Sequence, residues 1–343
     1  MSELFGERFT SPELIGEGGM GCVYRVQDPR LARTVALKML QSDLPDSLVA
    51  RFKNEAQITG KLEHPSIPPV YEYGETGQKV PYFALKLLNG QTLEEVIAKL
   101  VEGDSSTHEK YDFPERMRIC IRLCEALQYA HSEGVLHRDI KPENVMLGPF
   151  GEVWLLDWGV AGPPSAPEGT EEKTGRLTEE STFMGTMSFA APEQLAGIYS
   201  PHSDQYSLGA VFYEFFCLEA AHRGKDRMEL MTAVLHETPR SPESYKKPIQ
   251  GRVPREISNL LKRMLQKKPE DRFASVEDIK EEFQNIVGGD ISVVCPHTFA
   301  KKSMYRIGKA LDNHNYWLMP LLLLWLLYPL YAISQWLSGY LFG

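Results

Sequence analysis

The sequence is short of cysteine and of positive charge, and each shortage excludes a class of protein. Its five cysteines are scattered over 343 residues, and no two of them form a zinc-type CxxC pair. This pattern indicates reduced thiols in a cytosol-facing domain rather than a disulfide framework. The formal net charge of −9 argues against nucleic acid as a partner, because proteins that bind it usually carry basic surfaces.

Neither an internal repeat nor a secretory signal peptide is expected from the sequence. Met1–Thr10 contains three charges and no apolar run, so a secretory signal peptide is not expected. The hydrophobic fraction of 43% and the charged fraction of 24% are those of a folded globular protein. A chain of 343 residues can hold one large two-lobed domain or two ordinary domains.

Long apolar runs are absent except at the C-terminus. The stretch Tyr316–Trp336 is almost wholly apolar, and about 20 such residues suffice to cross a bilayer. We predict a single-pass transmembrane anchor at residues 316–336 and a juxtamembrane linker at residues 288–315; a buried terminal helix is the alternative. Positive charges just before the run place the preceding domain on the cytoplasmic side of the membrane. These charges are Lys301, Lys302, Arg306 and Lys309.

Hydrophobic periodicity divides the rest of the chain into a β-rich region, from Phe9 to Phe83, and a mainly helical region from Thr92 onward. The predicted strands include Val35–Leu40 and Pro69–Tyr73, and the predicted helices are Asp46–Leu62, Arg116–His131, Ser207–Leu218 and Ile257–Leu265. The polar stretches Glu102–Lys110 and Gly162–Glu180 are predicted to be loops. A β-rich lobe followed by a larger α-rich lobe predicts an α+β, two-lobed body.

Glycines cluster in the stretch GEGGMGCVY, which runs from Gly16 to Tyr24 between two strand-like runs. Glycines without Cβ atoms let backbone amides approach an anionic phosphate chain. A turn-rich hairpin would look similar, so the loop alone is weak evidence. A dinucleotide site is disfavoured, because its glycines would open a helix, whereas a second strand is predicted here.

A lysine and a glutamate on successive elements form a candidate ion pair. Lys38 ends the apolar run VALK, where its ammonium needs partners. Glu55, on the following predicted helix, is an available carboxylate. Such a pair would hold Lys38 toward nucleotide phosphates, whereas a solvated lysine and an unrelated surface glutamate are the ordinary alternative.

The segment HRDIKPEN, at residues 137–144, places a carboxylate, a cation and a metal-binding amide within eight residues. Asp139 can orient an attacking hydroxyl and accept its proton, and Lys141 can neutralise charge on a transferred phosphoryl group. Asn144 can ligate a magnesium ion together with Asp157, which lies thirteen residues further on. A later glutamate, Glu193, can pair with Arg272.

Together these motifs resemble those of the eukaryotic-type (Hanks-type) protein kinases. GEGGMGCVY, VALK, HRDIKPEN, DWG and APE follow one another in the order and at the spacings of that family, from about Phe9 to Ile286. The wording of the glycine loop, together with a membrane segment, is most similar to bacterial serine/threonine members. Lys141 matches the serine/threonine subgroup, since tyrosine kinases usually lack it.

The resemblance implies a kinase domain at residues 9–287, with an N-lobe at about 9–86 and a C-lobe at about 87–287. It implies transfer of the γ-phosphoryl group of ATP to serine or threonine of protein substrates, with Mg²⁺ or Mn²⁺ as the metal. Autophosphorylation is expected, and a dimer would let one chain phosphorylate another. The implied catalytic residues are Asp139, Lys141 and Lys38, and the implied metal ligands are Asn144 and Asp157.

The resemblance also assigns the nucleotide-binding residues. Val23, Ala36 and Met146 would enclose the adenine, and the backbone of Lys86 and Leu88 would bind its edge, next to the gatekeeper position Leu85. The full set expected to bind ATP is Gly16, Gly18, Gly19, Gly21, Val23, Ala36, Lys38, Glu55, Lys86, Leu88 and Met146. Asp204 would brace the catalytic loop from the helix below it.

Three positions depart from the family pattern. Trp158 replaces the usual phenylalanine of the DFG motif, Lys86 stands where an acidic residue is common, and Phe189 replaces a usual tyrosine before APE. None of these changes removes a catalytic group. Two alternatives are a pseudokinase acting as a scaffold at the membrane and a kinase for a small molecule. The retained Lys38, Asp139 and Asp157 argue against the first, and the APE segment with the helices after it argues against the second.

The segment between Asp157 and Glu193 is an expected site of regulation. Arg138 is predicted to lack a partner until a phosphate arrives on this segment and orders it. The candidate phosphorylation sites are Thr178, Ser181 and Thr182. Glu179 or Glu180 pairing with Arg138 would instead make the enzyme constitutively active.

Overall fold

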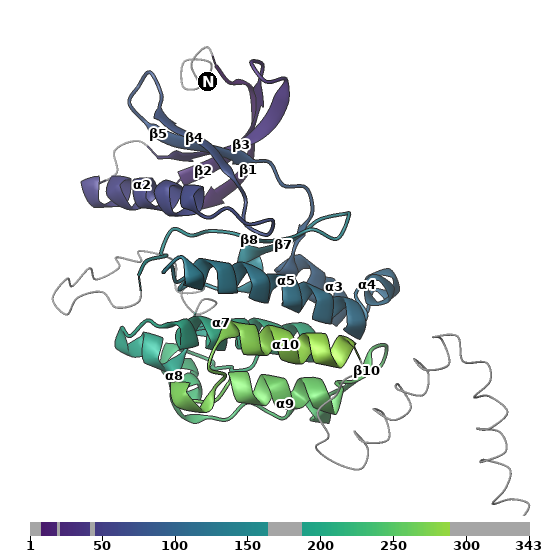
Figure 1. Ribbon diagram of the computed structural model, residues 1–343. Helices are drawn as coiled ribbons and strands as arrows, with labels where there is room; N and C mark the ends of the chain where they lie inside the picture. Colours follow the sequence, from purple (N-terminus) through teal and green to yellow (C-terminus); the bar gives the residue numbers. More distant parts are fainter. Residues whose placement is uncertain (1–7, 19–20, 42–44, 164–186, 289–343) are drawn as a thin grey trace, which may run out of the picture. The chain divides into compact units, whose positions relative to one another are not determined.

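The computed structural model describes residues 8–18, 21–41, 45–163 and 187–288 (Figure 1). Contacts separate the chain into two compact units, Met1–Gln284 and Asn285–Gly343, and all the elements below belong to the first apart from the end of the last helix. In the described ranges no helix is long and apolar enough to cross a membrane. The predicted anchor Tyr316–Trp336 lies outside the described residues, as does most of the predicted loop Gly162–Glu180.

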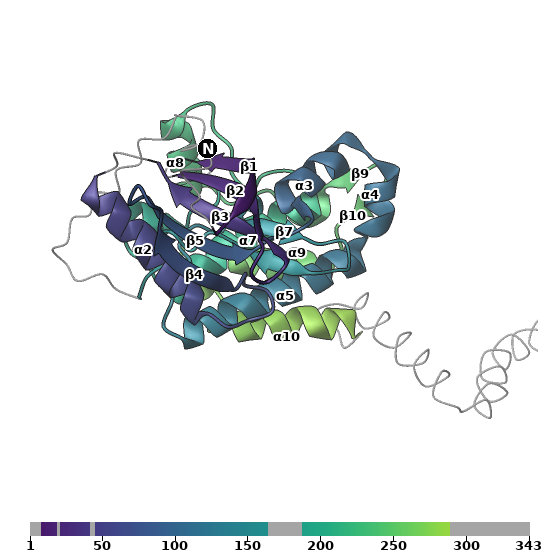
Figure 2. The ribbon, with the colours of Figure 1, turned by 90° about the horizontal axis from the view of Figure 1, so that it is seen from above.

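An antiparallel sheet of five strands forms the N-lobe, in the order β1-β2-β3-β5-β4. The strands are β1 (Thr10–Gly18), β2 (Gly21–Asp28), β3 (Arg33–Leu40), β4 (Val70–Glu75) and β5 (Pro81–Lys86). One helix, α2 (Asp46–Lys61), is inserted between β3 and β4 and lies along the sheet (Figures 1 and 2). The β-rich N-lobe with a single helix confirms the prediction from the sequence.

Alternation along β3 decides which of its side chains reach α2. Val35, Leu37 and Met39 pack in one apolar cluster with Phe9 and Val26. Residues two apart in a strand share a face, so Ala36, Lys38 and Leu40 point to the other side. There Leu40 packs with Phe52 and Ala56 of α2 and with Phe83. The lysine of this strand therefore faces the helix.

Helices form the C-lobe, in which two short antiparallel sheets are also present. The helices are α3 (Leu93–Glu102), α4 (Ser105–Lys110), α5 (Phe113–Ser132), α7 (Pro201–Cys217), α8 (Arg227–His236), α9 (Arg255–Met264) and α10 (Val276–Val287). The strands β6 (Gln91–Thr92), β7 (Val145–Leu147) and β8 (Val153–Leu155) form one sheet, and β9 (Lys246–Lys247) pairs with β10 (Gly251–Arg252). Short 3-10 turns lie at Pro142–Asn144, Pro192–Ala196, Pro242–Ser244 and Pro269–Asp271.

Helix α7 is the centre of the C-lobe core, because fourteen of its fifteen residues from Ser203 to Cys217 are buried. The buried side chains include Phe212 and Phe216. Both rings contact Phe283 of α10, with centroids 5.5 and 6.3 Å apart. Aromatic pairs at such distances add to the stabilisation from buried apolar area. The helix predicted at Ser207–Leu218 is thus confirmed, although it starts earlier, at Pro201.

The predicted loop Glu102–Lys110 is wrong in part, because Ser105–Lys110 forms α4. The side chain of Asp104 accepts a hydrogen bond from the backbone N–H of Thr107 at 2.7 Å and from the hydroxyl of Ser106 at 2.8 Å. Such a cap satisfies amides that a short helix leaves without partners. The same polar residues that suggested a loop therefore begin a helix.

A buried ion pair joins the APE motif to the C-terminal part of the lobe. The guanidinium of Arg272, fully buried, donates to both carboxylate oxygens of Glu193, at 2.6 and 2.9 Å. Two parallel bonds between a guanidinium and a carboxylate form a strong and geometrically specific pair. The pairing predicted from the sequence is confirmed, and it fixes the segment that ends at Glu193 against the loop after α9.

Candidate active site

Lys38 of β3 lies between two carboxylates. Its Nζ atom is 2.5 Å from Oε1 of Glu55 and 3.8 Å from Oδ1 of Asp157. Glu55 is on the buried face of α2, beside Phe52 and Ala56, so packing of the helix holds the carboxylate in place. The structure therefore forms the Lys38–Glu55 pair expected from the sequence and adds Asp157 as a second acidic neighbour.

The charges of this trio shift one another's pKa values. Burial alone would lower the pKa of Lys38, but the facing carboxylates Asp157 and Glu55 raise it. Burial and the charge of Asp157 raise the pKa of Glu55 despite the nearby ammonium. Partial burial disfavours the ionised form of Asp157, yet the positive charge of Lys38 and a hydrogen bond from the backbone N–H of Gly159 outweigh it and lower that pKa. The lysine is thus held charged, and the half-exposed Asp157 carboxylate is held ionised.

The catalytic loop is held from below by one buried carboxylate. Asp204 of α7 accepts hydrogen bonds at 2.9 Å from the backbone N–H groups of His137 and Arg138, and from Nε2 of His131 at 2.9 Å. Two successive amides converge on one carboxylate because Arg138 has a φ of 68°, in the left-handed region that is costly for a side chain with a Cβ atom. The brace that the resemblance assigns to Asp204 is present.

Asp139, Lys141 and Asn144 meet at the loop that follows. Nζ of Lys141 is 3.1 Å from Oδ2 of Asp139. The side-chain amide nitrogen of Asn144 donates to the backbone carbonyl of Asp139 at 2.8 Å. Because that bond uses the nitrogen of the amide, the amide oxygen is the atom that Asn144 offers to a cation.

The backbone places Asn144 next to the residue before Asp157. The N–H of Leu156 donates to the carbonyl of Asn144 at 2.8 Å, and Nε2 of His137 bonds the carbonyl of Leu156 at 2.9 Å. Asp157 itself has a φ of 59°, in the left-handed region that is costly for a residue with a Cβ atom. The segments that carry the two predicted metal ligands, Asn144 and Asp157, are therefore joined by a backbone hydrogen bond although they lie thirteen residues apart in the sequence.

This donor set suits a metal that retains other ligands. Among the described residues, no group of three or more His, Cys, Asp or Glu side chains is arranged to hold an ion by itself. Mg²⁺ commonly takes one or two protein oxygens and completes its shell with phosphate oxygens and water. Asn144 and Asp157 fit that requirement, with Lys38 close enough to share the same phosphates.

Comparison with known proteins agrees with this geometry. Residues 9–284 match the family described as "Protein kinase domain". The chain belongs to the protein kinase family. It is similar to the serine/threonine-protein kinase PknD of Chlamydia pneumoniae (32% identity over 297 residues, 82% of this chain and 31% of that protein).

Two further relatives carry the same name. The serine/threonine-protein kinase PknD of Chlamydia trachomatis serovar D is 33% identical over 304 residues, which are 83% of this chain and 32% of the relative. That of Protochlamydia amoebophila is 33% identical over 303 residues, 82% of this chain and 30% of the relative. The chain thus spans about a third of the length of the curated relatives it matches.

In this kinase domain the glycine loop is a hairpin between β1 and β2. Gly18 pairs with Gly21 across the strands, and Gly19 lies outside the described residues. A Cβ atom on Gly21 would lie 2.0 Å from the carbonyl oxygen of Met39, so this glycine is required by the packing of β2 on β3. At Gly16 and Gly18 an added Cβ would make ordinary contacts, so packing among the described residues does not require glycine at these two positions.

The residues expected around the adenine come from both lobes. Val23 is on β2, Ala36 on β3 opposite Leu85, and Met146 on β7. Lys86 ends β5, and Leu88 follows it in the connection to β6. The N–H of Lys86 already donates to the carbonyl of Pro69 at 3.1 Å, so the carbonyl of Lys86 is the backbone group it has left for a nucleotide. The side chain of Lys86 instead lies over the ring of Trp154, 5.3 Å from its centroid.

Trp158 in the DWG motif is packed rather than exposed. Its ring lies 4.6 Å from that of His137, and its Nε1 donates to the carbonyl of Leu155 at 3.3 Å. Only 1% of the residue is accessible. The indole therefore finds both an apolar site and a hydrogen-bond acceptor, as a buried tryptophan requires.

An acidic cluster beside the catalytic loop was not predicted from the sequence. Burial and the charges of Glu143 and Glu94 raise the pKa of Glu214 to about 7. One oxygen of Glu143 and one of Glu214 are inaccessible and have no hydrogen-bond partner in the described part of the chain. Glu143 could have been noticed within HRDIKPEN, but Glu94 and Glu214 come from α3 and α7, so only the fold brings the three together.

Proposed function

We propose that the chain is an ATP-dependent kinase that transfers the γ-phosphoryl group to serine or threonine residues of protein substrates. The observation that carries the proposal is the position of Lys38 between Glu55 and Asp157, with the Asp139–Lys141 pair on the adjoining loop. Lys141 and the names of the relatives favour serine and threonine as acceptors. An intact set of charged groups argues against a pseudokinase scaffold.

Bound ATP with Mg²⁺ or Mn²⁺ would supply the phosphoryl group and neutralise part of its charge. The residues of the chain then have separate tasks. Lys38, fixed by Glu55, would hold the nucleotide phosphates, and Asn144 and Asp157 would hold the metal. Asp139 would orient the acceptor hydroxyl and take its proton. Lys141 would stabilise negative charge on the transferred phosphoryl group. Positioning and electrostatic stabilisation are the main contributions that proteins make to phosphoryl transfer.

We also propose that the kinase domain spans residues 9–287 and is held at the membrane, with its active site in the cytoplasm. Support comes from the apolar run Tyr316–Trp336 and from the basic residues before it, since positive charge stays on the cytoplasmic side.

Autophosphorylation is the third part of the proposal. Arg138 donates to the carbonyl of Pro163 at 2.8 Å and lies 4.7 Å from the centroid of the Tyr199 ring. Its expected lack of any partner is therefore wrong. A phosphate on the segment between Asp157 and Glu193 would add an anionic partner to these contacts.

The catalytic proposal predicts loss of transfer on Asp157→Asn and on Lys38→Met, with the fold intact. Removing the charge of either side chain should cost on the order of several kcal/mol in the transition state, a fall of roughly 10³-fold or more. Transfer of radiolabel from ATP to casein measures the effect, and Asp46→Asn, an exposed aspartate at the start of α2, is the matched control. Near-normal transfer by Asp157→Asn at saturating magnesium would show that the metal site is wrong.

The membrane proposal predicts that the full-length chain resists extraction. An apolar helix that spans a bilayer is released by detergent but not by carbonate or salt. Fractionation followed by carbonate washing, beside a chain truncated after Val287, gives the comparison. The truncated chain should be soluble and active. Recovery of the full-length chain in the carbonate wash would rule out a spanning anchor.

The autophosphorylation proposal predicts phosphate on Thr178, Ser181 or Thr182 after incubation with ATP, and reduced activity in the triple-alanine variant. A phosphate brings about −1.5 to −2 charges and can order a segment through bonds to an arginine. Mass spectrometry of the wild type detects the modification. Mixing wild type with the Asp157→Asn chain tests transfer between chains, which a dimer would favour. An unmodified segment, or full activity in the triple variant, would contradict the switch.

A further inference from the structure

A buried polar group lies in the C-lobe outside the proposed catalytic centre. It consists of Tyr206 on α7, His222 in the loop after α7 and Lys267 in the loop after α9. Oη of Tyr206 and Nε2 of His222 are 2.8 Å apart, and Nζ of Lys267 lies 3.3 and 3.2 Å from them. Tyr206 is inaccessible and His222 is 4% exposed. Buried polar networks hold a fold rigidly when every member is satisfied.

Lys267 makes one more bond, to the backbone of α8. Its Nζ donates to the carbonyl of Val234 at 2.6 Å. That carbonyl is in the last turn of α8, where carbonyl oxygens lack partners within the helix and a cation matches the helix dipole. An ammonium has three donors, and Nζ of Lys267 has polar partners at 3.3, 3.2 and 2.6 Å on α7, on the loop and on α8. One side chain thus ties three segments together.

Charge supports this arrangement at neutral pH. Burial and the charge of Arg272 lower the pKa of Lys267 to about 8, although Glu237 opposes the shift. Burial and the charge of Lys267 lower the pKa of His222 to about 4. At pH 7 the histidine is therefore a neutral acceptor and the lysine is the cation that donates to it.

Val234 connects the group to the proposed active site. Its side chain packs in an apolar cluster with Met187 and Leu230. Met187 begins the described segment that leads to Gln194, whose side-chain amide donates to the carbonyl of Arg138 at 3.2 Å. Arg138 directly precedes Asp139, so the segment from Met187 to Gln194 lies beside the loop that would receive a substrate hydroxyl. A protein acceptor whose hydroxyl reaches Asp139 would lie next to this segment.

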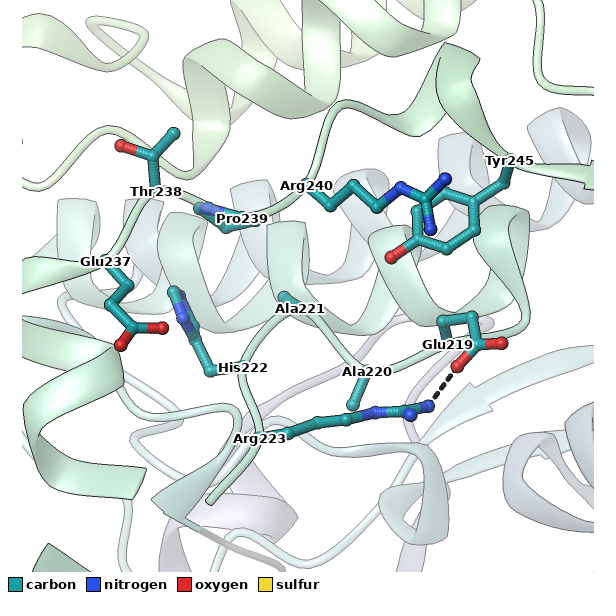
Figure 3. A pocket seen from close by; sticks show the side chains of 10 residues that line it. All are labelled: Glu219, Ala220, Ala221, His222, Arg223, Glu237, Thr238, Pro239, Arg240 and Tyr245. Atoms are coloured by element: carbon teal, nitrogen blue, oxygen red, sulfur yellow. Dashed lines mark hydrogen bonds and ion pairs between the residues drawn. The ribbon is translucent and has the colours of Figure 1, made fainter. Parts of the chain in front are cut away.

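A cavity of about 400 Å³ borders the same loop, away from the candidate active site. Figure 3 shows His222 and Glu237 on one side of it, with Arg240 and Tyr245 on another. The cavity is lined by the loop after α7 and by the segment that follows α8. Lys267 bonds the loop at His222 and the last turn of α8 at Val234, and Lys247, which lies beyond α8, pairs with Glu219 of the same loop at 2.7 Å.

We propose that Lys267 is a positioning residue for the protein substrate. Through Val234 and Met187 it holds the surface beside the catalytic loop, and it touches neither nucleotide nor reacting groups. The inference rests on the proposed function, since it presupposes a protein acceptor. It requires that losing Lys267 weakens the use of the protein substrate and leaves the use of ATP unchanged.

Steady-state kinetics on the full chain separate these effects. Lys267→Met removes the three donors but keeps the length of the side chain, so the KM for casein should rise by about 10-fold or more. The KM for ATP and the rate of ATP hydrolysis without casein should stay within about twofold of the wild type. Lys267→Arg, which restores a cation with several donors, should recover most of the casein KM. Lys268→Met, at the exposed neighbouring lysine, is the matched control.

Each outcome of this experiment decides the question. A wild-type chain that labels neither casein nor itself refutes the proposed function, whatever Lys267 does. If the wild type labels only itself, the Asp157→Asn chain replaces casein as the acceptor in the same comparison. An unchanged acceptor KM in Lys267→Met, or equal rises in the KM for acceptor and for ATP, overturns the positioning role. If Lys267→Met does not fold, His222→Leu, which removes one of the three acceptors, must show the selective rise in acceptor KM, and its absence overturns the inference.

Discussion

The arrangement of the candidate active site depends on one buried carboxylate, that of Asp204. Three donors from α5 and the catalytic loop converge on it, and the residue is only 1% exposed. A buried carboxylate is costly unless hydrogen bonds compensate it, so the loop can form only where its amides point at Asp204. The left-handed conformation of Arg138 is the backbone strain that these bonds sustain. Once Arg138 is fixed, Asp139 has one direction in which to point.

The rest of the site is added to this loop by short, direct links. His137 reaches the carbonyl of Leu156, and Leu156 in turn bonds Asn144, so the segment that carries Asp157 is attached to the loop that carries Asp139. Lys38 and Glu55 then connect Asp157 to the N-lobe. The site thus joins the two lobes through charged side chains, and the same side chains would hold the nucleotide phosphates and their metal. Its geometry therefore depends on the distance between β3, α2 and the catalytic loop.

Much of this could be predicted from the sequence, because the relevant signals are local. Alternation in β3 and the helical spacing in α2 put Lys38 and Glu55 on facing surfaces, and eight consecutive residues carry Asp139, Lys141 and Asn144. The helix α4 was missed because its residues favour loops and caps equally, and only the bond from Thr107 to Asp104 decides between them. Polar composition does not distinguish a loop from a capped helical turn.

Contacts between distant segments could not be predicted in the same way. Lys267 and Tyr206 are 61 residues apart, and neither carries a pattern that marks it as buried and paired. The acidic cluster of Glu94, Glu143 and Glu214 likewise exists only after three elements have packed. Gly21 shows the reverse case, in which a residue assigned to phosphate binding is also required by the backbone of a neighbouring strand. Local motifs could be recognised in the sequence, whereas packing between distant segments could not be predicted from it.

The measurement that tests this account most directly is the rate of phosphoryl transfer by Asp204→Asn. An asparagine keeps the shape of the side chain but loses the charge and one of the two acceptor oxygens, so the catalytic loop should lose its fixed geometry. Misplacement of a reacting group by about 1 Å can cost roughly 10²-fold in rate. We predict a fall in kcat of at least about that size, with nucleotide affinity within about threefold of the wild type. A kcat within about twofold of the wild type would contradict the claim that this carboxylate organises the active site.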